Sequence, residues 1–115
     1  MAHPKQHAVS SARKFGGTAD EYLKYHEWFD ATKAWIGNSD HRAFRHHSEG
    51  IFELEKIFGI SFINSENKEI FIRYIGEQHV KEDCYGIIPS ASDWIAALKA
   101  EVKPMWMLRT LKIED

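Results

Sequence analysis

Apolar residues recur at intervals of three and four positions over residues 18–36, which predicts an amphipathic helix there. Thr18, with Glu21 three residues later, has the spacing of a capping box, which typically marks a helix N-terminus. Gly37 follows the last apolar residue and is a typical C-terminal stop. Both ends of this first helix are therefore indicated by the sequence.

The same periodicity predicts a second helix over residues 40–58. Ser39 or Asp40 would cap its start, and Gly59 would end it. The link at Asn38 and Ser39 is short, and short links place consecutive helices next to each other. We therefore expect the two helices to pack side by side and antiparallel.

After the second helix, the period of the apolar positions changes to two, as in β-strands. Residues 60–75 are expected to form a β-hairpin with its turn at residues 64–67. Residues 76–86 indicate a short helix or helical turn, and Ser90 with Asp93 has the spacing of a capping box for a last helix. The expected fold class is α+β, predominantly helical, with one small antiparallel hairpin and one or two short C-terminal helices.

The length of 115 residues fits a single domain, residues 1–115. Hydrophobic residues make up 43% and charged residues 28% of the chain, which is typical of a globular protein. Residues 1–17 would form an N-terminal arm, in which residues 8–14 could make a short helix. Residues 105–115 would form a C-terminal tail, either a docking strand or an ordered arm.

The net charge of −2 argues against a dedicated nucleic-acid surface, which would be basic. The longest stretches without Asp, Glu, Lys or Arg have nine residues, too few to cross a bilayer. The first residues lack the apolar core of a secretory signal. The single cysteine, Cys84, allows no internal disulfide and is more typical of a small buried residue than of a nucleophile. We therefore expect a cytoplasmic protein.

Histidine occurs seven times, and two of these residues begin the same motif. His26 precedes Asp30 by four positions, as His79 precedes Asp83. On a helix this spacing places the imidazole and the carboxylate on one face. Such a pair can provide two metal ligands, or the carboxylate can orient the imidazole as a base. The alternative is two hydrogen bonds on exposed helix surfaces.

A second group of polar residues lies in the second predicted helix. His46 and His47 would diverge by about 100° on a helix, so one of them would face the site. Glu49 is three residues from His46 and would orient it or join it as a ligand. Arg42 and Arg45 provide donors suited to phosphate or carboxylate. The alternative is a solvated helix face with surface ion pairs.

The sequence contains no glycine-rich phosphate-binding motif, no H-E-x-x-H and no G-x-S-x-G. It resembles a family of small bacterial and phage-borne proteins of unknown function in four runs, HAVSSARKFGG, YHEWFDATKAW, DHRAFRHHSEGIFELEKIFG and RYIGEQHVKEDCYGIIPSASDW. The resemblance covers about residues 3–106 and implies no activity. It implies that eight residues belong to family motifs, namely His3, His7, His26, Asp30, His46, His47, His79 and Asp83.

We therefore expect the domain to bind a divalent transition metal, Zn, Fe, Mn or Ni, which mixed nitrogen and oxygen ligands suit. The expected ligands are His26, Asp30, His79, Asp83 and one or both of His46 and His47. His3 and His7 would close the site from the N-terminal arm. If the ion is catalytic, it would activate water in a hydrolase for a small anionic, phosphoester-like substrate, with Arg42 and Glu49 as catalytic residues.

Two other functions fit the same residues. The first is a non-enzymatic module that binds a small ligand or a protein, such as a phage-type inhibitor or sponge. The second is a helical interaction subunit whose histidines are structural. In each case a homodimer is expected, because Trp28 and Trp35 form a second aromatic face on the first helix and tryptophan is enriched at interfaces.

Overall fold

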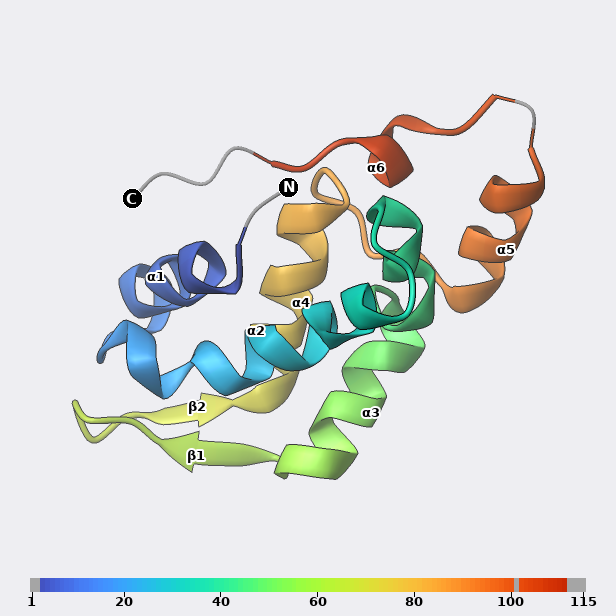
Figure 1. Ribbon diagram of the computed structural model, residues 1–115. Helices are drawn as coiled ribbons and strands as arrows, with labels where there is room; N and C mark the ends of the chain where they lie inside the picture. The colour runs from blue at the N-terminus through green and yellow to red at the C-terminus, as the bar shows by residue number, and fades with distance from the viewer. Residues whose placement is uncertain (1–2, 101, 112–115) are drawn as a thin grey trace.

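The computed structural model in Figure 1 is predominantly helical with one two-stranded antiparallel sheet, so the predicted α+β class is confirmed. The structure describes residues 3–100 and 102–111. Its α-helices are α1 (Pro4–Phe15), α2 (Leu23–Asp30), α3 (Ser48–Phe58), α4 (Ile72–Asp83), α5 (Ala91–Lys99) and α6 (Met105–Leu108). Its 3-10 helices are η1 (Ala19–Glu21), η2 (Ala31–Ala34) and η3 (Ser39–Phe44), and its strands are β1 (Ser61–Ile63) and β2 (Glu69–Phe71).

The first predicted helix, residues 18–36, is present as three consecutive helical pieces, η1, α2 and η2. Thr18 and Glu21 form the predicted capping box, in which Glu21 accepts a hydrogen bond from the Thr18 backbone N–H over 2.7 Å. Tight 3-10 turns at both ends of an α-helix are common. The sequence therefore located this helical segment, although only Leu23–Asp30 is α-helical.

The second predicted helix, residues 40–58, is not continuous, and that prediction is wrong at residues 45–47. The chain forms η3, leaves the helical path, and starts again at α3 with His47 as an extended N-cap residue. The break depends on Gly50, because a Cβ at this position would lie 1.8 Å from the Arg45 carbonyl oxygen. As a result His46 leaves the helix surface and is fully buried in the interior.

Gly50→Ala should destabilise the protein by about 3 kcal/mol or more, because the clash is with backbone and cannot be relieved by a rotamer change. Gly37→Ala is the matched control, since a Cβ at Gly37 meets no atom within 4 Å. Urea denaturation of the two variants measures the difference. Equal stability of both variants would contradict the close approach of the chain at Gly50.

The β-hairpin is shorter than the predicted range of 60–75. Its register pairs Phe62 with Ile70, and the second strand ends at Phe71. Residues 72–75, predicted as strand, begin α4 instead, since Ile72, Ile75 and Gly76 are buried at helical spacing. The predicted short helix at residues 76–86 is the continuation of α4.

The terminal segments carry more helix than predicted. The described part of the N-terminal arm is mostly α1, whose N-cap is His3, and it packs on α2 and α4. Ser90 and Asp93 form the predicted capping box of α5. The described part of the C-terminal tail contains α6, and residues 112–115 of the predicted tail lie outside the described residues.

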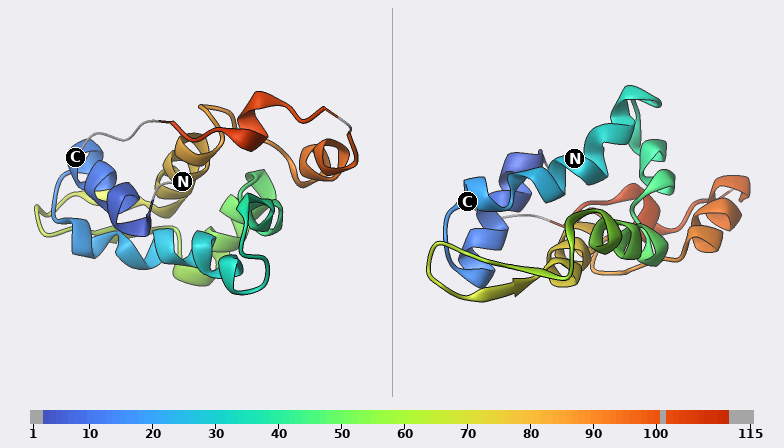
Figure 2. Two further views of the ribbon diagram at one scale, coloured as in Figure 1. Left: turned by 45° about the horizontal axis from the view of Figure 1, so that its top comes forward. Right: turned by 90° about the horizontal axis from the view of Figure 1, so that it is seen from below.

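Helix α4 is central to the packing, with α1, α2 and α3 all in contact with it (Figure 1). Helices α2 and α3 are in contact, but α2 packs chiefly on α1 and α3 chiefly on α4. The molecule is elongated, with the β-hairpin and α5 at opposite ends (Figure 2). Within the described residues, no helix combines the length and apolar character needed to span a membrane.

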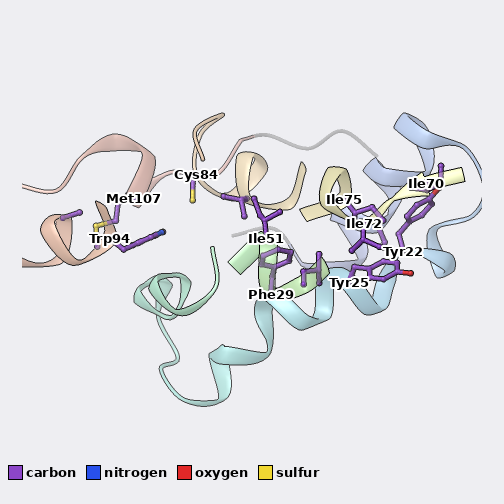
Figure 3. Packing of buried hydrophobic residues seen from close by; sticks show 14 residues of the cluster. Tyr22, Tyr25, Phe29, Ile51, Ile70, Ile72, Ile75, Cys84, Trp94 and Met107 are labelled. Atoms are coloured by element: carbon purple, nitrogen blue, oxygen red, sulfur yellow. The ribbon is translucent and has the colours of Figure 1, made fainter. Parts of the chain in front are cut away.

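The hydrophobic core follows this long axis (Figure 3). Tyr22 and Tyr25 pack near the hairpin, and Trp94 and Met107 join α5 to α6 at the other end. Phe29 lies between these groups, and its ring stacks on His79 with centroids 4.6 Å apart. The middle of the core therefore adjoins a buried polar cluster.

Candidate metal centre

Five histidines and two aspartates meet in the interior, where α1, α2 and α4 converge with the segment around η3. We call them the buried cluster: His7, His26, Asp30, His41, His46, His79 and Asp83. Every member is buried, and the most exposed of them, Asp30, has a relative accessibility of 6%. Burying this many ionisable groups is costly unless they are paired or bind a cation.

Four atoms of the buried cluster lie close together, and we call them the four-donor site: His46 Nε2, His79 Nε2, Asp30 Oδ1 and Asp83 Oδ2. His46 Nε2 lies 3.0 Å from the Asp83 oxygen and 3.3 Å from the Asp30 oxygen. His79 Nε2 lies 3.2 Å and 3.4 Å from the same two oxygens. The two nitrogens are 3.1 Å apart.

These separations are those of ligands around one ion. Bonds of about 2.0–2.1 Å in a tetrahedral site separate the ligand atoms by about 3.3–3.4 Å, and octahedral neighbours lie about 3 Å apart. Five separations in the four-donor site, the four between nitrogen and oxygen and the one between the nitrogens, run from 3.0 to 3.4 Å. The geometry therefore accommodates a transition-metal ion.

The hydrogen-bond network assigns the tautomer of His79. Ser11 Oγ donates to Gln78 Oε1 over 2.6 Å, so it accepts from His26 Nε2, 2.7 Å away. His26 Nδ1 is then free to accept from His79 Nδ1 over 2.9 Å. His79 Nε2 consequently carries a lone pair that points toward the two carboxylates. A histidine ligand is commonly held this way, through its other ring nitrogen.

Hydrogen bonds at Nδ1 orient the rings of His7 and His41 in the same way. His7 Nδ1 donates to Glu82 over 2.8 Å, which leaves Nε2 facing Asp83 Oδ1 at 3.2 Å. His41 Nδ1 lies 2.8 Å from the Thr32 hydroxyl, which itself donates to backbone carbonyls. The Nε2 atoms of both histidines are buried and have no hydrogen-bond partner among the described residues.

Seven buried side-chain polar atoms of the described residues lack a hydrogen-bond partner, and six of them belong to the buried cluster. They are His7 Nε2, Asp30 Oδ1, Asp30 Oδ2, His41 Nε2, His46 Nδ1 and Asp83 Oδ1. Each such atom costs about 1–3 kcal/mol when it is left unsatisfied. A cation held between the two aspartates would supply a partner for Asp30 Oδ1, which belongs to both this set and the four-donor site.

The two aspartates are held in their ionised form. Burial alone raises the pKa of Asp83, but the adjacent imidazoles of His46, His7 and His79 outweigh it and keep that pKa well below its usual value. For Asp30 burial likewise raises the pKa, and the adjacent imidazoles of His46 and His79 lower it further than burial raises it. Both carboxylates are therefore available as anionic ligands.

Most of the histidines are held in their neutral form. Burial lowers the pKa of His41 to about 4, and it also lowers the pKa of His79. His7 is the exception, because the carboxylates of Asp83 and Glu82 outweigh burial and raise its pKa to about 9. Uncharged imidazoles beside ionised carboxylates are in the state that metal binding requires.

Arg42 and Glu49, the predicted catalytic residues, occupy different surroundings. Arg42 is buried, donates to the Asp83 backbone carbonyl over 2.9 Å, and lies 3.7 Å from Asp83 Oδ1. It therefore positions Asp83 and does not face an open site. Glu49 is exposed in the first turn of α3, accepts from the Ala91 backbone N–H, and does not reach the buried cluster.

Of the expected ligands, the structure brings His26, Asp30, His46, His79 and Asp83 together and leaves His47 outside. His47 is buried as the N-cap of α3, where Nδ1 accepts from the Gly50 N–H over 2.9 Å and Nε2 donates to the Phe44 carbonyl over 3.1 Å. His3, expected to close the site, caps α1 instead. Both ring nitrogens of His47 are thus occupied by backbone.

His47→Ala should lower the free energy of unfolding by about 1 kcal/mol, because α3 loses its N-cap, while the metal content of the folded protein stays unchanged. Urea denaturation and elemental analysis of the same preparation measure both quantities. Metal loss from folded His47→Ala protein would place His47 in the metal centre after all.

Sequence reasoning missed His41 as a member of the cluster. In a continuous helix over residues 40–58, its five-residue distance from His46 gives no shared face, and only the break of the chain brings the two rings to 5.4 Å. No local motif identifies it.

Cys84 is buried, and burial raises the pKa of its thiol to about 12, as expected for an unreactive core cysteine.

Comparison with known proteins confirms the expected membership of a family of unknown function. No curated protein and no solved structure matches the chain. A family model described as a domain of unknown function, DUF6915, matches residues 2–107. Because that match spans nearly the whole chain and contains every residue of the buried cluster, the chain belongs to the DUF6915 family of domains of unknown function.

Proposed function

We propose that this domain binds a divalent transition-metal ion in the four-donor site. The observation that carries the proposal is that each of two imidazole nitrogens lies 3.0–3.4 Å from each of two carboxylate oxygens, with the nitrogens 3.1 Å apart. Two nitrogen and two oxygen donors suit Zn, Fe, Mn or Ni better than Ca or Mg. The ion would supply the partner that the buried Asp30 Oδ1 atom lacks.

The surroundings of the four-donor site support the same proposal. His79 is oriented from behind by His26, and Asp83 is held by Arg42. Such outer contacts fix the rotamer and tautomer of a ligand, and their loss typically weakens metal affinity about 10- to 100-fold. His26, expected as a ligand, is in this proposal a positioning residue for His79.

The test is elemental analysis of untagged protein after dialysis against each metal. We expect at least one equivalent of transition metal per chain in the wild type and a loss of metal in His79→Ala. His47→Ala is the matched control, because His47 is also buried but has both nitrogens bonded to backbone. Folded wild-type protein that takes up none of Zn, Fe, Mn or Ni would refute the proposal.

Hydrolysis is the narrower proposal for the same ion. Asp30 also lines a shallow surface recess of about 430 Å³, together with His3, Glu27 and Lys33. The recess would bring water and a small anion to the edge of the site, with Lys33 and His3 as basic groups on its rim. A bound ion would lower the pKa of a coordinated water, as in other metal-dependent hydrolases.

Turnover of bis-(p-nitrophenyl) phosphate by metal-loaded protein tests the hydrolase proposal. We expect a rate that is lost on chelation, and a higher KM for Lys33→Met. Metal-loaded protein that does not hydrolyse phosphoesters would contradict the hydrolase proposal. A closed site with four protein ligands is typical of structural metal ions, so this result would favour the non-enzymatic binding module.

We also propose a homodimer through the face that carries Trp28 and Trp35. Trp35 is 65% exposed and packs edge-on against Phe44, while Arg45 lies over the Trp28 ring at 4.3 Å. An exposed aromatic pair is typical of interface anchors. Sedimentation equilibrium at tens of micromolar should give the dimer mass, and Trp35→Ser should give the monomer mass; a monomeric wild type would contradict the proposal.

A further inference from the structure

We propose that the buried cluster is built for two metal ions bridged by Asp30. This inference rests on the proposed metal binding and divides the ligands of the four-donor site between two ions. One ion in the four-donor site uses one nitrogen each from His46 and His79 and one oxygen from each aspartate. This single ion leaves the Nε2 atoms of His7 and His41 buried and without a hydrogen-bond partner among the described residues.

The ligand atoms fall into two groups that share Asp30. In the first group His7, Asp30, His79 and Asp83 bring donor atoms within 4.8 Å of one another, and in the second group Asp30, His41 and His46 do the same. Neither oxygen of Asp30 accepts a hydrogen bond. A carboxylate with two free oxygens between two sets of imidazoles is the arrangement of two-metal sites, whose ions lie about 3.5–4 Å apart.

The histidines at the two ends of this arrangement are oriented as ligands. His7 donates from Nδ1 to Glu82, and His41 donates from Nδ1 to Thr32, so in both rings the Nε2 atom is directed into the cluster. These two hydrogen bonds come from different helices and depend on different partners. Two ions account for both orientations, and one ion in the four-donor site accounts for neither.

The charges predict that the two ions bind with unequal affinity. When His7 binds an ion as a neutral imidazole, Asp30, Asp83 and Glu82 bring three negative charges, and Arg42 brings one positive charge. One divalent ion balances this total, whereas a second ion adds charge that the protein does not offset. The second ion should therefore bind more weakly, and an anion that enters by the recess at Asp30 would strengthen it.

The experiment is a titration of metal-free protein with Mn²⁺, followed by electron paramagnetic resonance and equilibrium dialysis. We expect two steps that saturate at two ions per chain. The signal of an isolated Mn²⁺ should appear first and give way to an exchange-coupled signal in the second step. Inorganic phosphate should shift the second step, and not the first, to lower Mn²⁺ concentration.

His41→Asn separates the two ions. The asparagine amide can keep the hydrogen bond to Thr32 but has no atom in the place of Nε2. This variant should bind one ion per chain with no coupled signal, and His47→Ala should still bind two. If His41→Asn does not fold, the wild-type titration decides alone.

The outcomes distinguish this inference from the proposed function. A single step at one ion per chain, with no coupled signal at saturation, would overturn the two-ion centre and leave the four-donor site intact. Two coupled ions in folded His41→Asn would also overturn it. No Mn²⁺ binding at all, repeated with Zn²⁺, would overturn the proposed function itself.

Discussion

Removal of the metal should lower the melting temperature of this domain by about 15 °C. An ion present at about 1,000 times its dissociation constant stabilises the folded state by about 4 kcal/mol, and 1 kcal/mol shifts the melting temperature of a domain of this size by about 4 °C. Without the ion, the ionised and buried carboxylates of Asp30 and Asp83 keep oxygens that no hydrogen bond satisfies. The metal-free fold therefore retains an unfavourable interior.

Calorimetry of metal-loaded and chelator-treated protein measures this shift, and adding the metal back should restore the original melting temperature. Metal-loaded His47→Ala is the control for a buried histidine outside the centre, and its melting temperature should fall by only about 4 °C because it loses about 1 kcal/mol. A melting temperature that is the same with and without metal would show that the buried cluster is satisfied without an ion.

The two H-x-x-x-D motifs show how far the sequence predicts the site. The spacing placed His79 and Asp83 on one face of α4, and their side chains meet at 3.2 Å as expected. The same spacing in α2 gave a different result, because Asp30 joins the four-donor site whereas His26 supports His79 from behind. Helical spacing predicts a shared face, but the neighbouring helix decides which atom each residue meets.

The other members of the centre depend on contacts that are distant in sequence. His46 enters the interior because the chain leaves the helical path where Gly50 packs on the Arg45 carbonyl. The apolar spacing is continuous across residues 40–58 and therefore predicts one helix. His7 and His41 come from segments 34 residues apart, and their roles follow from partners such as Glu82, which no local motif connects to them.

The sequence pattern also did not predict the boundary between strand and helix at Phe71. Residues 69–75 alternate as a strand does, yet Ile72 and Ile75 fit a helix equally well. The structure follows the second pattern, since α4 then buries Ile72, Ile75 and His79 along one face against the core. This choice brings His79 and Asp83 into the interior, so the proposed metal centre depends on it.

Asp83→Asn should cost about 3–5 kcal/mol of stability and abolish metal binding. The substitution keeps the shape of the side chain but removes the negative charge that faces Arg42, His7 and His46. Breaking a buried ion pair on one side leaves the other charge without a partner, which is the cause of costs of this size. Urea denaturation and elemental analysis measure the two effects.

Asp93→Asn is the control for Asp83→Asn, because Asp93 is an exposed aspartate that accepts a hydrogen bond from the Ser90 N–H at the start of α5. It should cost less than about 1 kcal/mol and leave the metal content unchanged.

The double variant Asp83→Asn/Arg42→Met should regain part of the stability lost in Asp83→Asn, since it no longer buries an unpaired guanidinium. It should still bind no metal, because Asp83 supplies a ligand whereas Arg42 only positions it. Metal binding retained in folded Asp83→Asn would remove Asp83 from the centre and with it the two-histidine, two-aspartate ligand set.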